Sequence, residues 1–376
     1  MSRLPQGSLI GYMSSKVKEG GGINLAQGIP GYDPPAELLE SLRKASFKNV
    51  HQYPPGTGNF RLADFIAQSF KNELEITRDD VLITNGATEA LSLLFLYFTQ
   101  LFKHNFSVLA FDPAYESYSR LPEHFGVNYV SFSDYSQSSI DFESFEKHIR
   151  ENNVKLLFLS SPGNPYGRMF SESELDTLCL LSEKLDFYII FDAVYKELYT
   201  QQKPYQGLKH FGERYIYVNS FSKLLSITGW RIGYLIADSM HMKGIRSMHD
   251  YTGLCVPSVL QEALIDYLEG NNSGAEYIVW LRNQVNKVFS FFVPELEKMG
   301  FDIPPIAGGY FIWAQLPSKF KCGFEFAEKL YEKEKIAVVP GIQFSKNAKS
   351  YIRINIARPE DELNSAIEGL KRFVIA

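Results

Sequence analysis

Short apolar runs alternate with longer amphipathic segments through the middle of the chain, from about residue 80 to residue 240. Runs rich in Ile, Leu and Phe without polar alternation are typical of strands that are covered on both faces. The segments between them, such as Thr88–Phe102, Phe142–Glu151 and Ser171–Leu185, carry apolar residues on one helical face. The alternation predicts an α/β fold with a mainly parallel sheet and helices on both sides. The predicted strands are Val81–Thr84, Ser107–Phe111, Asn128–Phe132, Lys155–Ser160, Phe187–Phe191, Tyr215–Asn219 and Ile232–Ala237.

The last hundred residues follow a different pattern, which begins with a long helical segment at about Glu276–Lys298. It predicts a small α+β domain, which the first residues of the chain join because chain ends often meet. We place the small domain at residues 1–35 and 277–376, and the large domain at residues 36–276. The later predicted elements are strands at Tyr310–Gln315, Ala337–Val339 and Tyr351–Ile356, and helices near Phe324–Lys333 and Glu360–Phe373.

Composition and charge narrow the classes of function. The chain has 376 residues, of which 45% are apolar and 22% charged, as in ordinary globular proteins. Its 38 basic and 43 acidic residues give a net charge of −5, which offers no general field for a nucleic-acid backbone. The three cysteines form no CxxC pair and are too few for a disulfide framework, which favours a location in the reducing cytoplasm. The seven histidines show no metal-binding spacing, so we expect no metal site. The longest apolar stretch, Leu91–Phe102, has about 12 residues and is too short to cross a membrane.

A lysine flanked by hydroxyl groups is the strongest chemical signal. Ser220-Phe221-Ser222-Lys223 follows a predicted buried strand, and Arg231 stands eight positions after the lysine. Desolvation lowers the pKa of a lysine, and a neutral amine can attack a carbonyl group to form a Schiff base. The hydroxyl groups and Arg231 suit a phosphate dianion. The alternative is a surface lysine beside a loop arginine.

Polar residues also follow two neighbouring predicted strands. Asp192 comes directly after one strand and Tyr195 stands three residues further on, while Asn164 lies in the Ser-Pro-Gly-Asn-Pro turn after the other. A carboxylate at the carboxyl end of a buried strand is either a helix N-cap or a functional acid. Asn164 is either a turn residue or a hydrogen-bonding group of a site.

A third signal is the passage from strand to helix at Thr84-Asn85-Gly86-Ala87-Thr88-Glu89-Ala90. Exposed N–H groups at a helix start bind anions, and Gly86 allows a phosphate to approach the chain closely. A plain strand-to-helix turn is the alternative. The chain has no GxxxxGK[ST] sequence, and Gly56-Thr57-Gly58 lacks the third glycine of a dinucleotide fingerprint.

Along the chain the clusters come in the order anion-binding segment, Asn164, Asp192 with Tyr195, Lys223 and Arg231. In this order they resemble the fold-type I aminotransferases of classes I and II, which depend on pyridoxal 5'-phosphate (PLP). The resemblance extends from Asn24 to Asn355, and its closest branch is that of the methionine and kynurenine (glutamine-type) aminotransferases. It implies the type I PLP-dependent transferase fold. The phrases that carry it are NLAQGIPGYDPP, QYPPGTGNFRLADFIA, ITNGATEAL, FDPAYESY and SFSKLLSITGWRIGY.

The resemblance implies a role for each matching residue. Lys223 would bind PLP covalently and later move a proton, and Asp192 would keep the pyridine nitrogen protonated so that the ring withdraws electrons. Tyr195 and Asn164 would hydrogen-bond the phenolic oxygen of the ring, and Tyr115 would stack on its face instead of serving only as core. The residues implied at the phosphate are Gly86, Ala87, Thr88, Ser220, Ser222 and Arg231.

Further residues are implied at the substrate and in the partner subunit. Arg353, inside a predicted buried strand, would clamp the α-carboxylate with Asn164 and the backbone of Gly28; a structural salt bridge is the alternative. Tyr53 would reach the phosphate of a neighbouring subunit, which implies a homodimer with shared sites. Arg168 departs from the small or hydroxylic residue that relatives more often carry; we expect it on the surface, and a contact with the entrance of the site is the alternative.

These implications lead to a specific expectation of function. The protein would transfer the amino group of an apolar or aromatic amino acid (methionine, aromatic or glutamine-like) to a 2-oxo acid. The alternative on the same scaffold is a C–S β-lyase that acts on cysteine conjugates. A more remote alternative is a non-catalytic binding module, against which the intact Lys223 argues.

Overall fold

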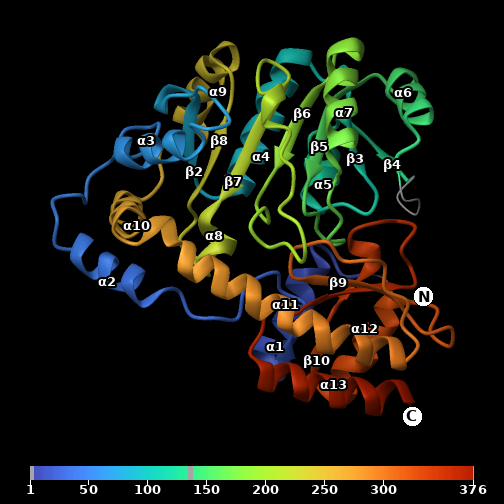
Figure 1. Ribbon diagram of the computed structural model, residues 1–376. Helices are drawn as coiled ribbons and strands as arrows, with labels where there is room; N and C mark the ends of the chain where they lie inside the picture. Colours follow the sequence, from blue (N-terminus) through green and yellow to red (C-terminus); the bar gives the residue numbers. More distant parts are fainter. Residues whose placement is uncertain (1–3, 134–138, 376) are drawn as a thin grey trace.

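A central sheet organises the structure, a computed structural model that describes residues 4–133 and 139–375 (Figure 1). Within those residues, seven strands form this sheet in the order β2-β8-β7-β6-β5-β3-β4. Strand β8 runs antiparallel to both of its neighbours, and every other neighbouring pair is parallel. The prediction of a mainly parallel sheet is therefore confirmed. The strands are β2 (Val81–Thr84), β3 (Ser107–Phe111), β4 (Asn128–Phe132), β5 (Val154–Ser160), β6 (Tyr188–Asp192), β7 (Tyr215–Ser220) and β8 (Gly233–Ile236).

Helices cover both faces of this sheet, as the unbroken apolar runs predict. Successive strand residues point to opposite faces, so that Val108 and Ile190 enter one core while Leu109 and Ile189 enter the other. The first core is closed by α4 (Ala87–Phe102), α5 (Ser117–His124) and α9 (Ser239–Thr252). The second is closed by α3 (Phe60–Ser69), α6 (Phe142–Glu151), α7 (Glu172–Leu185) and α10 (Ser258–Gly270).

The two ends of the chain meet beside the long helix α11 (Ala275–Lys298) (Figure 1). Strand β1 (Ile23–Asn24) pairs in parallel with β10 (Ile336–Ala337), and an antiparallel sheet runs in the order β11-β12-β9. The fold class predicted from the sequence is confirmed in these features. The other elements are α1 (Leu9–Gly20), α2 (Ala36–Ala45), α8 (Phe221–Leu224), β9 (Phe311–Gln315), α12 (Gly323–Glu334), β11 (Val339–Pro340), β12 (Tyr351–Asn355) and α13 (Glu360–Ile375).

The predicted domain boundaries stay predictions. Residues 1–3 and 376 of the predicted small domain, and residues 134–138 of the predicted large domain, lie outside the described residues. Among the helices that the structure describes, none combines the length and the apolar character needed to cross a membrane.

Register brings the polar ends of three strands to one edge of the central sheet. Ser160 of β5 pairs with Asp192 of β6, and β7 ends beside them at Ser220. Ser220 in turn lies opposite Gly233 of β8. A Cβ atom at Gly233 would lie 2.6 Å from the backbone carbon of Gly86, so that this glycine lets the start of α4 approach the same edge. Ligands of open α/β sheets bind at this carboxyl edge.

Candidate active site

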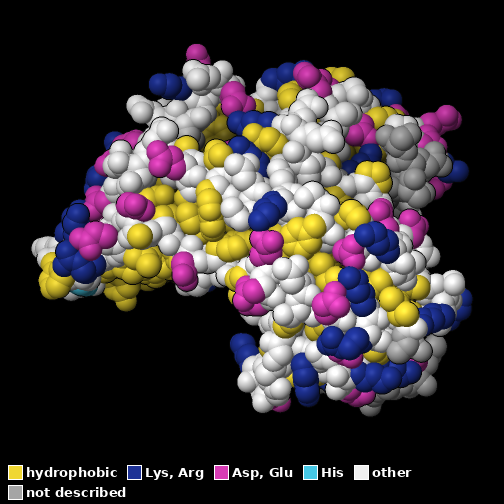
Figure 2. Space-filling view, turned by 60° about the horizontal axis from the view of Figure 1, so that its bottom comes forward, with side chains coloured by type: hydrophobic (Ala, Val, Ile, Leu, Met, Phe, Trp, Pro, Cys, Tyr) yellow, Lys and Arg dark blue, Asp and Glu magenta, His cyan; other side chains and the backbone are white. Residues whose placement is uncertain are grey.

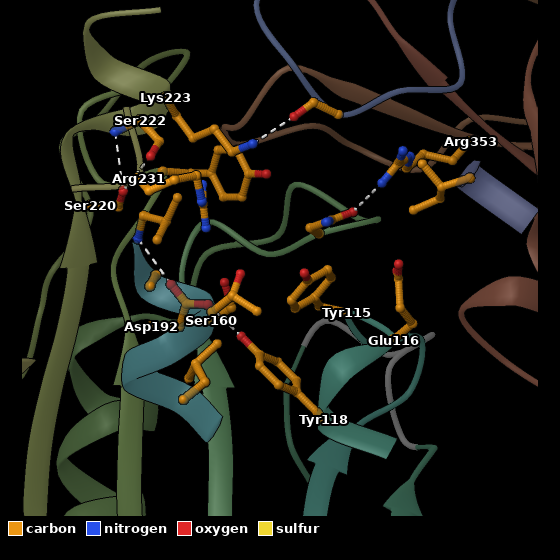
Figure 3. A pocket seen from close by; sticks show the side chains of 18 residues that line it. Tyr115, Glu116, Tyr118, Ser160, Asp192, Ser220, Ser222, Lys223, Arg231 and Arg353 are labelled. Carbon is orange, nitrogen blue, oxygen red and sulfur yellow. Dashed lines mark hydrogen bonds between the residues drawn. The ribbon is translucent and has the colours of Figure 1, made fainter. Parts of the chain in front are cut away.

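A cavity of about 230 Å³ opens at the carboxyl edge of the central sheet, between that edge and the sheet that holds β12 (Figure 3). The structure brings nearly all of the predicted site residues to it, although they are spread over more than 300 positions of sequence. Those that line the cavity are Gly28, Ala87, Thr88, Tyr115, Asn164, Asp192, Tyr195, Ser220, Ser222, Lys223, Arg231 and Arg353.

Two predicted residues do not line the cavity. Gly86 is the N-cap of α4 and lies directly behind Arg231, whose Nη2 atom would be 2.6 Å from a Cβ atom placed on Gly86. Tyr53 lies on the surface with 83% of its area exposed. Its predicted contact with a neighbouring subunit is a proposal to which we return below.

Lys223 sits on the single turn of α8, directly after β7, and its amine points into the cavity (Figure 3). The Nζ atom donates a hydrogen bond of 2.6 Å to the carbonyl oxygen of Gly28. Burial lowers the pKa of Lys223 to about 8, helped by the positive charges of Arg353 and Arg231 and opposed by Asp192. The cavity therefore holds a lysine that is partly neutral near physiological pH, unlike a solvated surface lysine.

Asp192 is buried at the end of β6 and is held by two donors. The hydroxyl of Tyr118 donates to Oδ2 over 2.8 Å, and the N–H of Val194 donates to Oδ1 over 3.1 Å. Burial raises the pKa of Asp192, whereas the two hydrogen bonds and the charge of Lys223 act to lower it. The helix N-cap considered from the sequence is wrong, because a turn and not a helix follows β6: one oxygen accepts from the N–H group in that turn, while the other accepts from Tyr118 of α5.

The start of α4 and the loop around α8 form an anion cradle. The N–H group of Ser222 donates to Ser220 Oγ over 3.1 Å, which holds the two hydroxyl groups side by side. The Arg231 guanidinium donates to the carbonyl oxygens of Asn85 (3.1 Å) and Thr228 (3.0 Å), which fixes it against the helix start. Gly86 has φ +77°, and a side chain there would collide with this guanidinium. Backbone donors, hydroxyls and an arginine at a helix N-terminus are the groups that hold a phosphate.

Arg353 of β12 is 1% exposed and closes the opposite end of the cavity. Its Nη1 atom donates to Asn164 Oδ1 over 2.9 Å and its Nη2 atom to the carbonyl oxygen of Ala26 over 2.6 Å. Both partners are neutral oxygens, which does not fit the structural salt bridge considered from the sequence, and Nε is buried without a partner among the described residues. The Cζ atom of the guanidinium lies 4.1 Å from the ring centroid of Phe311 and 4.8 Å from that of Phe344, so both rings pack on it. Burial lowers the pKa of Arg353 from its usual value, and the Glu116 carboxylate opposes that shift.

Two aromatic residues that were predicted from the sequence lie between these ends. Tyr195 is 6% exposed and packs edge-to-face on Tyr310, with ring centroids 5.3 Å apart. Tyr115 stands at the centre of the cavity lining and meets Tyr118 edge-to-face at 5.6 Å (Figure 3). Burial raises the pKa of both Tyr115 and Tyr195, so that both hydroxyls stay protonated.

Sequence reasoning missed several residues of the cavity. Tyr118 lies in the first turn of α5 and packs on Tyr115, which precedes the helix, and the three-residue spacing of the two tyrosines can be read from the sequence. Glu116 gives no such signal, because a glutamate at the start of a helix ordinarily faces solvent. The missed lining residues are Ile10, Leu91, Glu116, Tyr118, Ser160 and Val194.

Arg168 contradicts its predicted surface position. Its side chain is 12% exposed and forms an ion pair with Glu174, with Nη2 and Oε1 separated by 2.5 Å. Glu174 also accepts a hydrogen bond from the N–H of Ser171 in the capping box of α7. The helix start thus places a carboxylate where the turn after β5 brings the arginine, which accounts for its burial.

Comparisons with known proteins agree with this geometry. Residues 21–370 match the family model of the class I and II aminotransferases. The chain is 27% identical to a probable N-acetyl-LL-diaminopimelate aminotransferase of Bacillus subtilis, over 94% of this chain and 89% of that protein. It is 28% identical to a probable aspartate aminotransferase of Methanocaldococcus jannaschii, over 93% of each. The crystal structure of an aspartate aminotransferase from Thermotoga maritima has a TM-score of 0.86 and 28% identity, covering 98% of this chain and 96% of that one.

Proposed function

This chain belongs to the class I and II aminotransferases, which use PLP, and from that premise we propose that it acts on apolar, aromatic or glutamine-like amino acids. The observation that carries the proposed amino-transfer chemistry is the joint presence of Lys223, Asp192 and Arg353 in the lining of one cavity. Ile10, Leu91 and Tyr115 give part of that cavity an apolar or aromatic lining, which suits such side chains. We also propose that the chain lies in the methionine and kynurenine branch, on the strength of the sequence phrases, and that it works in the cytoplasm.

The residues present fit PLP. The cradle at the start of α4 would hold the phosphate through Gly86, Ala87, Thr88, Ser220, Ser222 and Arg231, and the missing Cβ atom of Gly86 gives the Arg231 guanidinium room to lie against the helix start. When bound, the cofactor supplies a ring that withdraws electrons from the α-carbon of the substrate.

The polar residues between the two ends of the cavity would orient that ring. Asp192 would keep the pyridine nitrogen protonated, and Tyr118 would hold Asp192 in place through its 2.8 Å hydrogen bond. Tyr195 and Asn164 would donate to the phenolic oxygen, while Tyr115 would cover one face of the ring.

Lys223 would bind the cofactor and then serve as the general base. Because its pKa is lowered to about 8, the neutral amine, which could take the α-proton of the substrate, is more populated near neutral pH than in an ordinary lysine. A positioned base of this kind contributes roughly 10² to 10⁴-fold to a rate. The hydrogen bond to the Gly28 carbonyl shows that the amine already reaches the segment proposed to meet the substrate.

Arg353 would bind the α-carboxylate of every substrate. Its two neutral partners orient the guanidinium without neutralising it, so that a bidentate contact with a carboxylate remains open to the other N–H groups. Asn164, which accepts from Arg353, and the backbone of Gly28 would complete the contact.

We further propose a homodimer in which Tyr53 reaches the partner's phosphate. The apolar residues that would be buried between the subunits are Phe47, Tyr53, Tyr251 and Leu254, whose exposed fractions are 83%, 83%, 91% and 48%. A Cβ atom placed on Gly56 would lie 3.3 Å from the carbonyl oxygen of Leu254. The loop that contains Tyr53 and Gly56 therefore lies beside the residues that follow α9. Figure 2 shows hydrophobic side chains gathered at the left of the molecule, near the α2 and α10 end. Exposed apolar patches of this kind mark protein contacts.

Half-reaction spectroscopy tests the proposed function. The purified holoenzyme is mixed with single amino acids, and the loss of the cofactor's aldehyde absorbance is followed together with the products. We expect methionine, aromatic amino acids and glutamine to react and to yield their oxo acids. A reaction confined to aspartate and glutamate would contradict the substrate class. Release of pyruvate, ammonia and a thiol from a cysteine conjugate, with the aldehyde form regained, would identify the β-lyase instead.

A further inference from the structure

Glu116 contributes to the cavity a carboxylate of which one oxygen has no hydrogen-bond partner among the described residues. It is the N-cap residue of α5 but makes no capping hydrogen bond. Its Oε1 atom accepts a long hydrogen bond of 3.4 Å from Ser8, and its Oε2 atom is buried without a partner among the described residues. Figure 3 shows the side chain rising from α5 toward Arg353, on the far side of Tyr115 from Lys223 and Asp192.

The position of Glu116 relative to Arg353 limits what it can bind. Burial raises the pKa of the Glu116 carboxyl and the Arg353 guanidinium opposes that shift, just as Glu116 opposes the lowering of the Arg353 pKa, so the two charges lie within electrostatic reach of each other. When a substrate carboxylate occupies Arg353, the attraction that the guanidinium exerts on Glu116 is largely cancelled. An unpaired buried carboxylate is costly, and the remaining part of the substrate is then the available source of a hydrogen-bond donor.

We propose that Glu116 is a specificity-determining residue that accepts a hydrogen bond from a donor at the end of the substrate side chain, such as a primary amide, and rejects a second carboxylate. The inference rests on the proposed function because Arg353 must take the α-carboxylate. It narrows the substrates proposed above toward those with a side-chain N–H group. A dicarboxylic substrate would place two carboxylates face to face, whereas its monoamide would place a donor opposite an acceptor.

Equilibrium binding of two inert analogues tests this inference without turnover. Glutarate and glutaramate are isosteric, lack an amino group and differ only in whether the distal group is a carboxylate or an amide. We expect calorimetry on the wild-type protein to show glutaramate binding at least tenfold more tightly than glutarate. Equal affinities, a preference for glutarate, or no detectable binding of glutaramate would overturn the proposal, and this comparison depends on no variant.

Glu116→Gln then assigns the preference to this residue. The substitution is isosteric and removes the charge, so we expect the affinity ratio of glutaramate to glutarate to fall at least tenfold. The matched control is Glu123→Gln on the same helix, where the glutamate is 61% exposed and pairs with Arg120, and there the ratio should not change. If Glu116 only positioned Arg353, the substitution would shift both affinities by the same factor, and an unchanged ratio would overturn the proposal.

Half-reactions of the holoenzyme separate this inference from the proposed function. Glutamine, methionine and glutamate have nearly the same size, and we expect the wild-type kcat/KM to fall in that order. Glu116→Gln should lower the ratio of glutamine to glutamate at least tenfold while the bound cofactor is retained. If no amino acid reacts, the proposed function fails, and the calorimetric ratio still decides the role of Glu116. If amino acids react but glutamate equals glutamine, the role of Glu116 is wrong and the aminotransferase assignment stands.

Discussion

At the scale of single residues, burial sets the protonation of the groups that would do the chemistry. Lys223 loses solvent and lies near Arg231 and Arg353, so its pKa falls to about 8. Asp192 is also desolvated, but Tyr118 and the Val194 N–H group supply two hydrogen bonds that favour its charged form. The two groups therefore differ in what stabilises their charges, and each can be tested by a single substitution.

The lowered pKa of Lys223 predicts how its reactivity depends on pH. In the protein freed of cofactor, the neutral fraction grows as pH rises through about 8, whereas an ordinary lysine becomes neutral only near pH 10.4. Arylation by trinitrobenzenesulfonate, followed by peptide mass mapping, should give a midpoint near pH 8 at Lys223, with the exposed Lys147 as reference. Arg231→Gln removes a cation that lowers this pKa and should raise the midpoint. A midpoint above pH 10 in the wild type would contradict the prediction.

Asp192 and Tyr118 should act on the same step with different strengths. Asp192→Asn cannot hold the pyridine proton, so we expect it to keep bound cofactor but lose most of the rate of α-proton abstraction. Tyr118→Phe removes one hydrogen bond to a charged group, worth about 1.5–3 kcal/mol, and should slow the same step by roughly ten- to a hundredfold. Single-turnover kinetics measures both variants. Near-normal chemistry in Asp192→Asn would leave Asp192 with only its turn contact to Val194.

Arg353→Lys tests whether Arg353 reads the carboxylate common to all substrates. Lysine lacks the planar fork and would leave the space between Phe311 and Phe344 poorly filled. Since each charge-assisted hydrogen bond is worth about 1.5–3 kcal/mol, kcat/KM should fall by roughly two orders of magnitude or more. The loss should be similar for every amino acid that reacts, and cofactor affinity should barely change. Selective loss of one substrate, or release of the cofactor, would contradict the assignment.

At the scale of elements, close backbone contact shapes the anion cradle. Strand β8 pairs with both β7 and β2, which places Gly233 against the start of α4 and beside Ser220. A Cβ atom at Gly233 would lie 2.6 and 2.7 Å from backbone atoms of Gly86 and Ala87. Backbone atoms cannot rotate away as a flexible side chain can, so this contact fixes where the helix N–H groups point.

Gly233→Ala should therefore disturb the cradle. Overpacking of this kind costs about 1–3 kcal/mol, and the shift of α4 should weaken PLP binding measurably. Gly229→Ala is the matched control, because a Cβ atom there meets nothing within 4 Å. Chemical denaturation measures the free energy of unfolding of each variant, and a titration with PLP measures its affinity for the cofactor. If Gly233→Ala binds the cofactor as tightly as Gly229→Ala, the close contact does not position the cradle.

At the scale of the whole molecule, several large apolar side chains at one end are exposed in the described single chain. Tyr53 belongs to the loop that contains Gly56, and this loop lies beside the backbone of Leu254. The exposed side chains of Phe47, Tyr53, Tyr251 and Leu254 do not line the cavity of their own subunit. A twofold interface would bury this patch against its own copy and bring Tyr53 to the neighbouring site.

Tyr251→Asp should weaken that dimer. A charge at a side chain that is 91% exposed in the single chain does not disturb its core, but it would be buried unpaired in the interface. Sedimentation velocity should show a shift from dimer to monomer, accompanied by weaker cofactor binding because Tyr53 no longer reaches its site. Leu180→Asp on α7, at a residue 60% exposed outside the patch, should leave the dimer intact. A wild-type protein that sediments as a monomer would contradict the proposal.

The sequence by itself determined the central sheet and most of the cavity. Buried strands need unbroken apolar runs, so each run predicted for the central sheet appears as a strand, shifted by at most one residue at either end. The run predicted at Ala337–Val339 was wrong as a single strand, because it is divided between β10 and β11, which pair in different sheets. Parallel strands end at one edge, so the residues that follow them, Asn164, Asp192 and Lys223, had to meet there. The sequence phrases that contain or accompany these residues, occurring together and in order, indicated the family.

Tertiary structure alone decided which residues from remote segments complete the cavity. Ser8 contacts Glu116 across 108 positions of sequence, and Arg168 turns inward because the capping box of α7 presents Glu174 to it. The direction of Glu116 depends on the packing of α5 against the sheet and on the return of the chain's first helix to the cavity mouth. Local patterns report the burial of a segment, but they do not report which distant segment covers it, because that is set by the packing of all the elements together.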